Sequence, residues 1–247
     1  MEPQLEHSVA DGIATVVISN PAKRNAMTAD MWRALPGLLA ELATDREVRA
    51  LVLTGAGGTF CAGADISTLR EPGDEQQSLA VHAEEALAAF PKPTLAAVRG
   101  YCVGGGSQLA AACDLRFAAE GALFGVTPAK LGIVYPASST RRLVSLVGPA
   151  AAKYLLFSGE LIDTERALRT GLVDEVLPVG ELDKRVAEFT RVLVSRSLLT
   201  QAAAKEFATG RKDRDAHWAE QARGSGDTAE GVAAFLERRA PRFTWSV

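Results

Sequence analysis

The stretch "GYCVGGGSQLAAACDLR", residues 100–116, runs from a triple glycine into small and apolar residues and ends where a new strand is predicted. Its spacing predicts a helix that begins at Ser107 and carries Gln108 in its first turn. A glycine-rich loop that enters a helix exposes backbone N–H groups at the positive end of the helix dipole. Such N–H groups bind anions or stabilise an oxyanion, and close backbone packing explains the glycines equally well.

Three common glycine motifs do not fit this chain. The dinucleotide-binding pattern GxGxxG fails in "GAGGTF", because Phe60 stands where the third glycine belongs. The triple glycine is not followed by Lys and then Ser or Thr, so it forms no phosphate-binding loop. Ser107 is followed by Gln108, which excludes the nucleophile elbow GxSxG.

The composition is that of a soluble globular protein. Of the 247 residues, 47% are hydrophobic and 23% are charged, which is enough apolar material for a sizeable core. The formal net charge of −3 argues against nucleic acid as the main partner. An anionic small ligand is still compatible with this charge, because a local basic patch is sufficient to bind one.

Cysteine and histidine usage predicts neither disulfides nor a metal site. Cys61, Cys102 and Cys113 form no CxxC pair, and the three histidines show no metal-ligand spacing. The first residues, "MEPQLEHS", lack the apolar segment of a secretory signal, and no apolar run reaches the length of a membrane span. We therefore expect a cytoplasmic protein with reduced thiols and no membrane contact.

Strands and helices alternate over the first two thirds of the chain, and helices dominate from about Ser138. Alternation of this kind predicts an α/β core with crossover connections. We expect residues 1–190 to form this core and residues 191–247 to form a helical arm that assembles subunits and covers a site. The predicted order begins with a hairpin turning at Asp11-Gly12 and a helix from Thr28, its predicted N-cap, to about Leu42. The strand "VRALVLTG", a helix from about Asp74 to Phe90, and the strands "TLAAV", "DLRFAA" and "GLVDEVLP" follow.

A second small-residue loop, "FCAGADI" at 60–66, follows a buried strand. Two loops at the carboxyl ends of neighbouring strands are placed to supply one N–H each to a single carbonyl oxygen. That arrangement holds the enolate of a thioester.

These motifs together resemble the crotonase, or enoyl-CoA hydratase/isomerase, family. The resemblance rests on "NPAKRNAM", "VRALVLTGAGGTFCAGADI", "KPTLAAVRGYCVGGGSQLAAACDLRFAAEGALFG" and "RLVSLVGPAAAKYLLFSGE", and it runs over nearly the whole chain. It implies an α/β fold with a crotonase-like (ββα) spiral core, a helical C-terminal arm, and a homotrimer or a hexamer of two trimers. It also implies a coenzyme A thioester as substrate and no separate cofactor.

The same resemblance implies where the ligand lies. The thioester carbonyl would accept hydrogen bonds from the N–H groups of Ala64 and Gly105, and the adenine would lie near Arg24. The residues that the resemblance places around the substrate and coenzyme A are Arg24, Ala26, Ala62, Asp65, Ile66, Gly104, Pro128 and Leu131.

The chain departs from the family's hydratases at both acid–base positions. Those hydratases carry one glutamate two positions after the glycines and another shortly after the "FG". Here the first position is Gln108, whose amide cannot act as a base near neutral pH. Counted from Phe124-Gly125, the second position is Pro128, which has no side-chain acid or base.

The segment "TPAKLGIVY" at 127–135 is similar to the branch of the family that decarboxylates methylmalonyl-CoA. Loss of CO2 forms the enolate without a base, and Tyr135 would hold the acyl carboxylate as a neutral phenol. The similarity is incomplete, because that branch has a glutamate at the position of Gln108 and a histidine at that of Ala64.

Three functions therefore stay open at this level: an unconventional hydratase, a decarboxylase of malonyl-type thioesters, and a protein that binds acyl-CoA without converting it. The catalytic candidates are Ala64, Gly105, Gln108 and Tyr135. Possible substitutes for the missing glutamates are His82, Glu71, Asp74 and Glu75.

Overall fold

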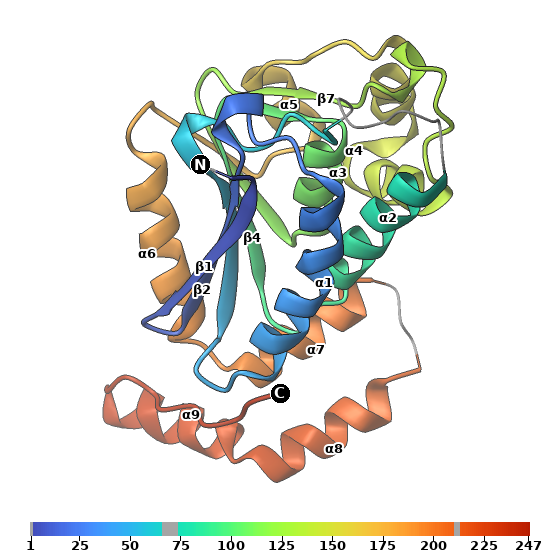
Figure 1. Cartoon of the computed structure of the whole chain (residues 1–247). Coiled ribbons are helices and arrows are strands. Elements are labelled where there is room, and N and C mark those ends of the chain that lie inside the picture. Colours follow the sequence, from blue (N-terminus) through green and yellow to red (C-terminus); the bar gives the residue numbers. More distant parts are fainter. Residues whose placement is uncertain (1, 66–73, 210–212) are drawn as a thin grey trace.

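A computed structural model describes residues 2–65, 74–209 and 213–247 of the chain. A six-stranded sheet lies at its centre, with the strand order β1-β2-β3-β4-β6-β8 (Figure 1). The first two strands are antiparallel and all the others run parallel, as the predicted crossovers require. The strands are β1 Gln4–Ala10, β2 Ile13–Ser19, β3 Ala50–Gly55, β4 Thr94–Val98, β6 Leu115–Ala119 and β8 Glu175–Leu177.

One face of the sheet is covered by α1 (Ala29–Thr44), α2 (Asp74–Ala88) and α3 (Gly105–Ala112). Trp32 and Leu35 of α1 are fully buried there, because apolar residues recur along this helix at the spacing of one face. The side chain of Thr28 caps the helix by accepting a hydrogen bond from the N–H of Met31. The predicted cap is confirmed.

The opposite face of the sheet is covered by α6 (Leu182–Val194), which lies across the sheet from α1 in Figure 1. Leu182 and Val186 pack there against Phe117 of β6, and Phe189 adds a tilted ring contact to Phe117. The sheet is thus buried on both sides, which is the usual state of a parallel sheet. The division predicted between residues 190 and 191 falls inside α6 and stays a prediction.

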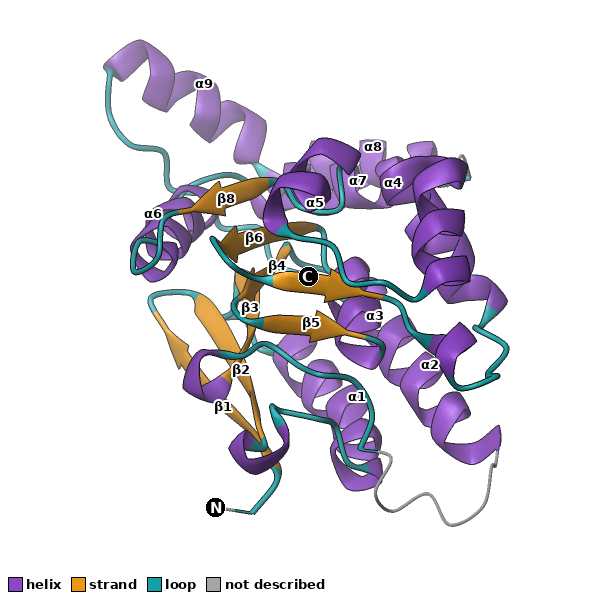
Figure 2. Cartoon of the chain, turned by 90° about the horizontal axis from the view of Figure 1, so that it is seen from above, coloured by secondary structure: helices purple, strands orange, loops and turns teal. Residues whose placement is uncertain are grey.

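A separate two-stranded parallel sheet pairs β5 (Tyr101–Val103) with β7 (Leu123–Gly125), and Figure 2 shows their two arrows side by side. The triple glycine directly follows β5. The helix after it begins at Gly105, not at Ser107 as predicted, because Gly104 takes the N-cap position with a φ of 56°. Gly105 and Gly106 therefore belong to the first helical turn, where close packing requires their lack of a side chain.

The last part of the chain is helical, as predicted. α4 (Ala137–Ser158) is kinked at Gly148, and α5 (Thr164–Thr170) follows it. The last helices are α7 (Leu198–Ala208), α8 (Asp215–Ser225) and α9 (Asp227–Glu237), and the last two lie below the core in Figure 1. The mixed α/β architecture with C-terminal helices is the predicted fold class.

We expect Gly106→Ala to lower the free energy of unfolding by about 3 kcal/mol, because the added methyl group has no space. A Cβ at this position would lie 2.2 Å from the carbonyl oxygen of Cys61, which is backbone and cannot turn aside. Denaturant unfolding followed by circular dichroism measures the change.

Gly37 provides the matched control. It is exposed inside α1, and a Cβ there would meet no atom within 4 Å. Gly37→Ala should therefore raise the free energy of unfolding by about 0.5–1 kcal/mol. An unchanged stability of Gly106→Ala would contradict the packing described here.

Candidate functional site

The two small-residue loops predicted to form a site lie against each other. Cys61 N–H donates to the carbonyl of Tyr101 at 2.8 Å, and Val103 N–H donates to the carbonyl of Cys61 at 3.0 Å. Cys61 and Cys102 form an isolated parallel bridge that joins the loops. The loop after β3 is thus paired with β5 of the small sheet, immediately before the glycines.

The N–H of Ala64 takes no part in the hydrogen bonds that join its loop to Met27. Ala64 forms a parallel bridge with Met27, and the two hydrogen bonds of this bridge use the neighbours of Ala64. Met27 N–H donates to the Gly63 carbonyl at 2.8 Å, and Asp65 N–H donates to the Met27 carbonyl at 2.8 Å. The bridge therefore leaves the Ala64 N–H available to a ligand.

The N–H of Gly105 lies close to that of Ala64. A Cβ built on Gly63 would lie 3.5 Å from Gly105 N, and one built on Gly105 would lie 3.5 Å from Ala64 N. Gly105 is the first residue of α3, so its N–H has no acceptor within the helix. A side chain at Gly105 would also meet Trp32 Cζ2 at 2.9 Å. The glycines thus keep the space between two N–H donors open.

Gln108 is 5% exposed, and its amide is held by a network of buried side chains. Gln108 Nε2 donates to Glu84 Oε2 at 2.5 Å and to Ser139 Oγ at 3.1 Å. Ser139 Oγ donates to the same Glu84 oxygen at 2.5 Å, and Arg142 Nη1 donates to Glu84 Oε1. The first acid–base position of the family is therefore an amide with a buried carboxylate directly behind it.

Glu84 is not among the predicted site residues, although its position on α2 carries a sequence signal. Ala80, Ala83 and Leu87 are buried apolar residues of α2, and Glu84 falls on the same helical face. A glutamate is rarely buried there unless it is paired. Ser139 and Arg142 lie on α4 and have no sequence signal that links them to α2 or α3.

The predicted coenzyme A residues at the N-terminal side lie together. Ala62 N–H donates to the Arg24 carbonyl at 3.0 Å, and the Arg24 guanidinium stacks over Tyr101 with 4.7 Å to the ring centre. Lys23 Nζ contacts Asp65 Oδ2 at 2.7 Å. Ala26 is buried beside them. This region offers cationic side chains next to the Ala64 loop.

The segment after β7 supplies the remaining predicted residues. Pro128 begins a short 3-10 helix, Pro128–Lys130, and Leu131 after it is 55% exposed. The Gly104 N–H donates to the Gly125 carbonyl at 2.8 Å, which ties this segment to the glycine loop. The ring of Tyr135 packs against the main core, and burial raises the pKa of its phenol above its ordinary value. Tyr135 is thus a neutral phenol at physiological pH.

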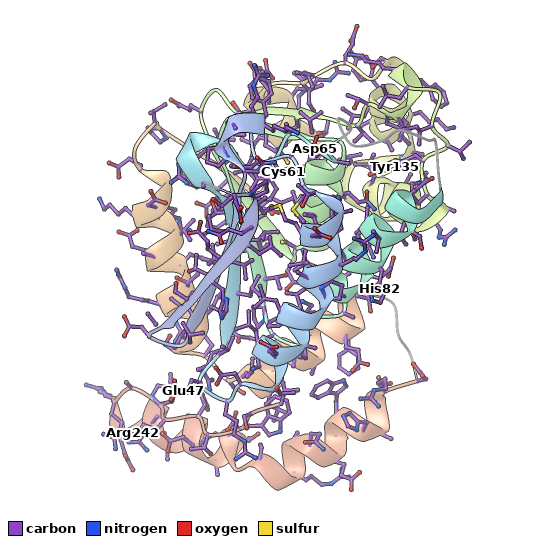
Figure 3. All side chains as sticks on the ribbon, viewed as in Figure 1. Glu47, Cys61, Asp65, His82, Tyr135 and Arg242 are labelled. Atoms are coloured by element: carbon purple, nitrogen blue, oxygen red, sulfur yellow. The ribbon has the colours of Figure 1, made fainter. Side chains whose placement is uncertain are left out.

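The possible substitutes for the missing glutamates are not all placed. His82 lies on α2 and is separated from Cys61 and Asp65 in the view of Figure 3, so it is not brought to the two loops. Ile66, which was predicted to contact coenzyme A, lies outside the described residues. The candidate base Glu71 does so too, as do the side chains of Asp74 and Glu75.

Neither a metal cluster nor a spanning helix is found in residues 2–65, 74–209 and 213–247. Histidine, cysteine and acidic side chains nowhere gather there in a group of three or more able to hold a metal ion. The described helices are also too short or too polar to cross a membrane.

All three cysteines are buried: Cys61 lies in the loop after β3, Cys102 lies in β5, and Cys113 is the C-cap of α3. Burial raises the pKa of Cys61 to about 12 and that of Cys113 to about 12, and it raises the pKa of Cys102 further. Their thiols are therefore protonated at neutral pH, which makes them poor nucleophiles. The burial of all three thiols agrees with the interpretation of these residues as ordinary core cysteines.

Comparison with known proteins points to one family. A family model described as Enoyl-CoA hydratase/isomerase matches residues 8–245. The chain is 34% identical to the short-chain-enoyl-CoA hydratase of Clostridium acetobutylicum, with 92% of each protein covered. It is also 34% identical to the mitochondrial enoyl-CoA hydratase domain-containing protein 2 of Bos taurus, with 94% of this chain and 84% of the relative covered.

The fold comparison agrees. A crystal structure described as an enoyl-CoA hydratase/isomerase family member superposes with a TM-score of 0.92 at 39% sequence identity. The match covers 100% of this chain and 98% of the other.

We expect the free energy of unfolding to decrease as the pH rises above about 9. Thiols ionise near pH 8.5 in an unfolded chain, whereas the buried thiols keep their protons up to about pH 12. The folded state then binds more protons than the unfolded state, so each thiol lowers the stability by at most about 1.4 kcal/mol per pH unit.

Denaturant unfolding between about pH 8 and 10 measures this slope. The variant Cys113→Ala should lose about one third of it, since one of three thiols is removed. A wild-type stability that is constant over this range would contradict the burial of the thiols.

Proposed function

This chain belongs to the enoyl-CoA hydratase/isomerase family, and from that premise we propose that it binds an acyl-CoA thioester and stabilises the enolate of its acyl group. The resemblance to the crotonase superfamily noted in the sequence is confirmed. The observation that carries the proposal is that the backbone nitrogens of Ala64 and Gly105 lie near each other, and that the Met27 bridge and the helix do not use their N–H groups. Two such donors, aimed at one oxygen in a site that excludes water, supply a large share of the catalysis in enolate chemistry.

The proposed position of coenzyme A follows from the cationic region beside the Ala64 loop. Arg24 and Lys23 provide positive charge, and Ala26, Ala62 and Asp65 line the same segment. Gly104, which follows β5, and Pro128 and Leu131, which follow β7, would also contact the substrate. The substrate supplies its own coenzyme A, so the proposal needs no additional cofactor.

The nominal reaction, addition of water to an enoyl thioester, is the one for which several relatives are named. It requires a group that takes a proton from the water attacking the β carbon and a group that gives a proton to the α carbon. Gln108 and Pro128 cannot exchange protons in this way, and Glu84, the carboxylate that contacts Gln108, is held by three donors. We therefore propose that conventional hydration is at most a slow side activity of this site.

Decarboxylation of a malonyl-type thioester is the second candidate, and the buried phenol of Tyr135 supports it. Loss of CO2 leaves an enolate directly, and so the oxyanion site alone supports this step. A phenol is protonated at neutral pH, and partial burial raises the pKa of Tyr135 further, so its hydroxyl could donate to an acyl carboxylate. The third possibility is binding of acyl-CoA without conversion.

We further propose that the protein assembles as a homotrimer or as a hexamer of two trimers. Phe235 and Leu236 on α9 are 81% and 74% exposed, and Val232 on the same helix is 56% exposed. Apolar side chains gathered on one exposed helix are typical of an interface. The cytoplasm remains the proposed compartment, although one relative carries a mitochondrial name.

Infrared spectroscopy of a bound acyl-CoA labelled with 13C at the thioester carbonyl tests the oxyanion site. We expect the carbonyl stretch to move to lower wavenumber on binding, because two N–H donors polarise the bond. Ala64→Pro removes one donor and should reduce this shift and lower any turnover by about 100-fold.

Ala64→Gly is the control for this experiment, because it removes only the methyl group and keeps the N–H. It should retain the full shift of the carbonyl band. A wild-type protein that binds the thioester without any shift would disprove the oxyanion assignment, and a protein that does not bind it at all would disprove the proposed function.

Hydration of crotonyl-CoA, followed by mass spectrometry, tests the role of the two replaced glutamates. We expect little product from the wild type and little gain from Gln108→Glu, since Pro128 still leaves the second carboxylate absent. The double variant Gln108→Glu/Pro128→Glu should gain at least about 100-fold, the usual contribution of acid–base groups. A similar gain from Gln108→Glu alone would show that one carboxylate is sufficient.

A further inference from the structure

Glu84 is a buried carboxylate that the proposed chemistry does not use. Its side chain is 1% exposed, and it lies on α2 between α3 and α4. Oε1 accepts from Arg142, while Oε2 accepts from both Gln108 and Ser139. Arg142 also contacts the exposed Glu85 at 3.2 Å. A buried charge is costly unless it is paired in this way, so the arrangement of its donors is strongly constrained.

This carboxylate determines which way the Gln108 amide points. An ionised carboxylate only accepts hydrogen bonds, and so the group that faces Glu84 must be the NH2 of Gln108 and not its carbonyl oxygen. The second NH2 hydrogen meets Ser139 Oγ, whose own proton goes to Glu84. The hydrogen bonds among Gln108, Ser139 and Glu84 can therefore all form in only one orientation of the Gln108 amide. The reversed amide would place two acceptor oxygens against each other.

The carbonyl oxygen of Gln108 is left free and accessible. The described residues place no donor within hydrogen-bond distance of Oε1. In the described part of the chain, the fully buried side-chain atoms without a hydrogen-bond partner are Trp32 Nε1 and Gln201 Oε1. Gln108 Oε1 is not one of them, so it is not fully buried. Oε1 is therefore slightly exposed, on a residue that is 5% exposed overall.

Its location follows from helix geometry. Side chains of a helix lean toward its N-terminus, and residues three apart share a face, so the Gln108 amide lies over the first turn that begins at Gly105. The free acceptor is thus next to one of the two N–H groups proposed to hold the thioester carbonyl.

We propose that Glu84 is a positioning residue that, with Ser139 and Arg142, fixes the carbonyl oxygen of Gln108 toward the acyl group of the bound thioester. The site then prefers acyl groups that carry an uncharged hydrogen-bond donor, such as a hydroxyl or an amide N–H, close to the thioester. This inference rests on the proposed function, because it assumes that acyl-CoA binds at Ala64 and Gly105.

The same arrangement disfavours an anionic acyl group. An acceptor oxygen that cannot turn offers no donor to a carboxylate, and two acceptor oxygens that face each other repel. The arrangement therefore weighs against malonyl-type thioesters and so against the decarboxylation candidate.

Calorimetric titration of the full chain with three coenzyme A thioesters tests the inference. The probes are butyryl-CoA, 3-hydroxybutyryl-CoA and malonyl-CoA, and the measured quantity is the ratio of their dissociation constants. We expect the wild type to bind 3-hydroxybutyryl-CoA about fivefold more tightly than butyryl-CoA, the usual effect of one neutral hydrogen bond. Malonyl-CoA should bind more weakly than butyryl-CoA.

In Glu84→Gln the new amide can donate to Gln108, so the Gln108 amide can turn and present its NH2 group. The preference for 3-hydroxybutyryl-CoA over butyryl-CoA should then disappear, and malonyl-CoA should gain relative to butyryl-CoA. A residue with a merely structural role would change all three dissociation constants together and leave the ratios as they are.

Glu85→Gln is the matched control, because it changes the neighbouring residue and the other partner of Arg142 without touching Gln108. The ratios of its three dissociation constants should equal those of the wild type. If Glu84→Gln does not fold, the ratios of dissociation constants of the wild type still test the inference. Equal affinity for butyryl-CoA and 3-hydroxybutyryl-CoA would overturn it, as would tighter binding of malonyl-CoA than of butyryl-CoA. Failure of all three thioesters to bind would instead overturn the proposed function.

Discussion

The candidate site depends on a backbone contact that leaves no room for a side chain. At Gly106 the first turn of α3 lies so close to Cys61 that a Cβ would overlap the Cys61 carbonyl oxygen. This contact brings the end of β5 against the loop that follows β3, and through it two backbone N–H groups from distant parts of the sequence become neighbours. Since both donors belong to the backbone, the site survives changes in most of its side chains.

A buried charge network specifies what the site presents beside those donors. Glu84 comes from α2, Gln108 from α3, and Ser139 and Arg142 from α4, so three helices must pack correctly before the network closes. A network of this kind is costly if any member is missing, and it therefore imposes one orientation on each of them. The amide at position 108 thus has a defined direction that its residue type alone does not reveal.

The sequence predicts correctly those elements whose pattern is contained within a few consecutive residues. The hairpin at Asp11-Gly12, the cap at Thr28 and the buried strands follow from turn chemistry and hydrophobic spacing over a few residues. The start of α3 was placed two residues late, because a pair of glycines gives no helical signal of its own. The strand β5 was missed for a related reason, since three residues are too few for a period to be seen.

The order of amino acids alone is enough to indicate the α/β architecture, the two glycine-bearing loops and the replacement of both glutamates by Gln108 and Pro128. These are properties of residue type and short-range spacing, which a chain carries before it folds. Tertiary packing alone decides that Glu84 lies behind Gln108, that His82 lies apart from the loops, and which atom of the amide is free. The physical reason is that hydrogen-bond direction and burial depend on groups 24 to 58 positions apart in the chain, which meet only when the helices pack.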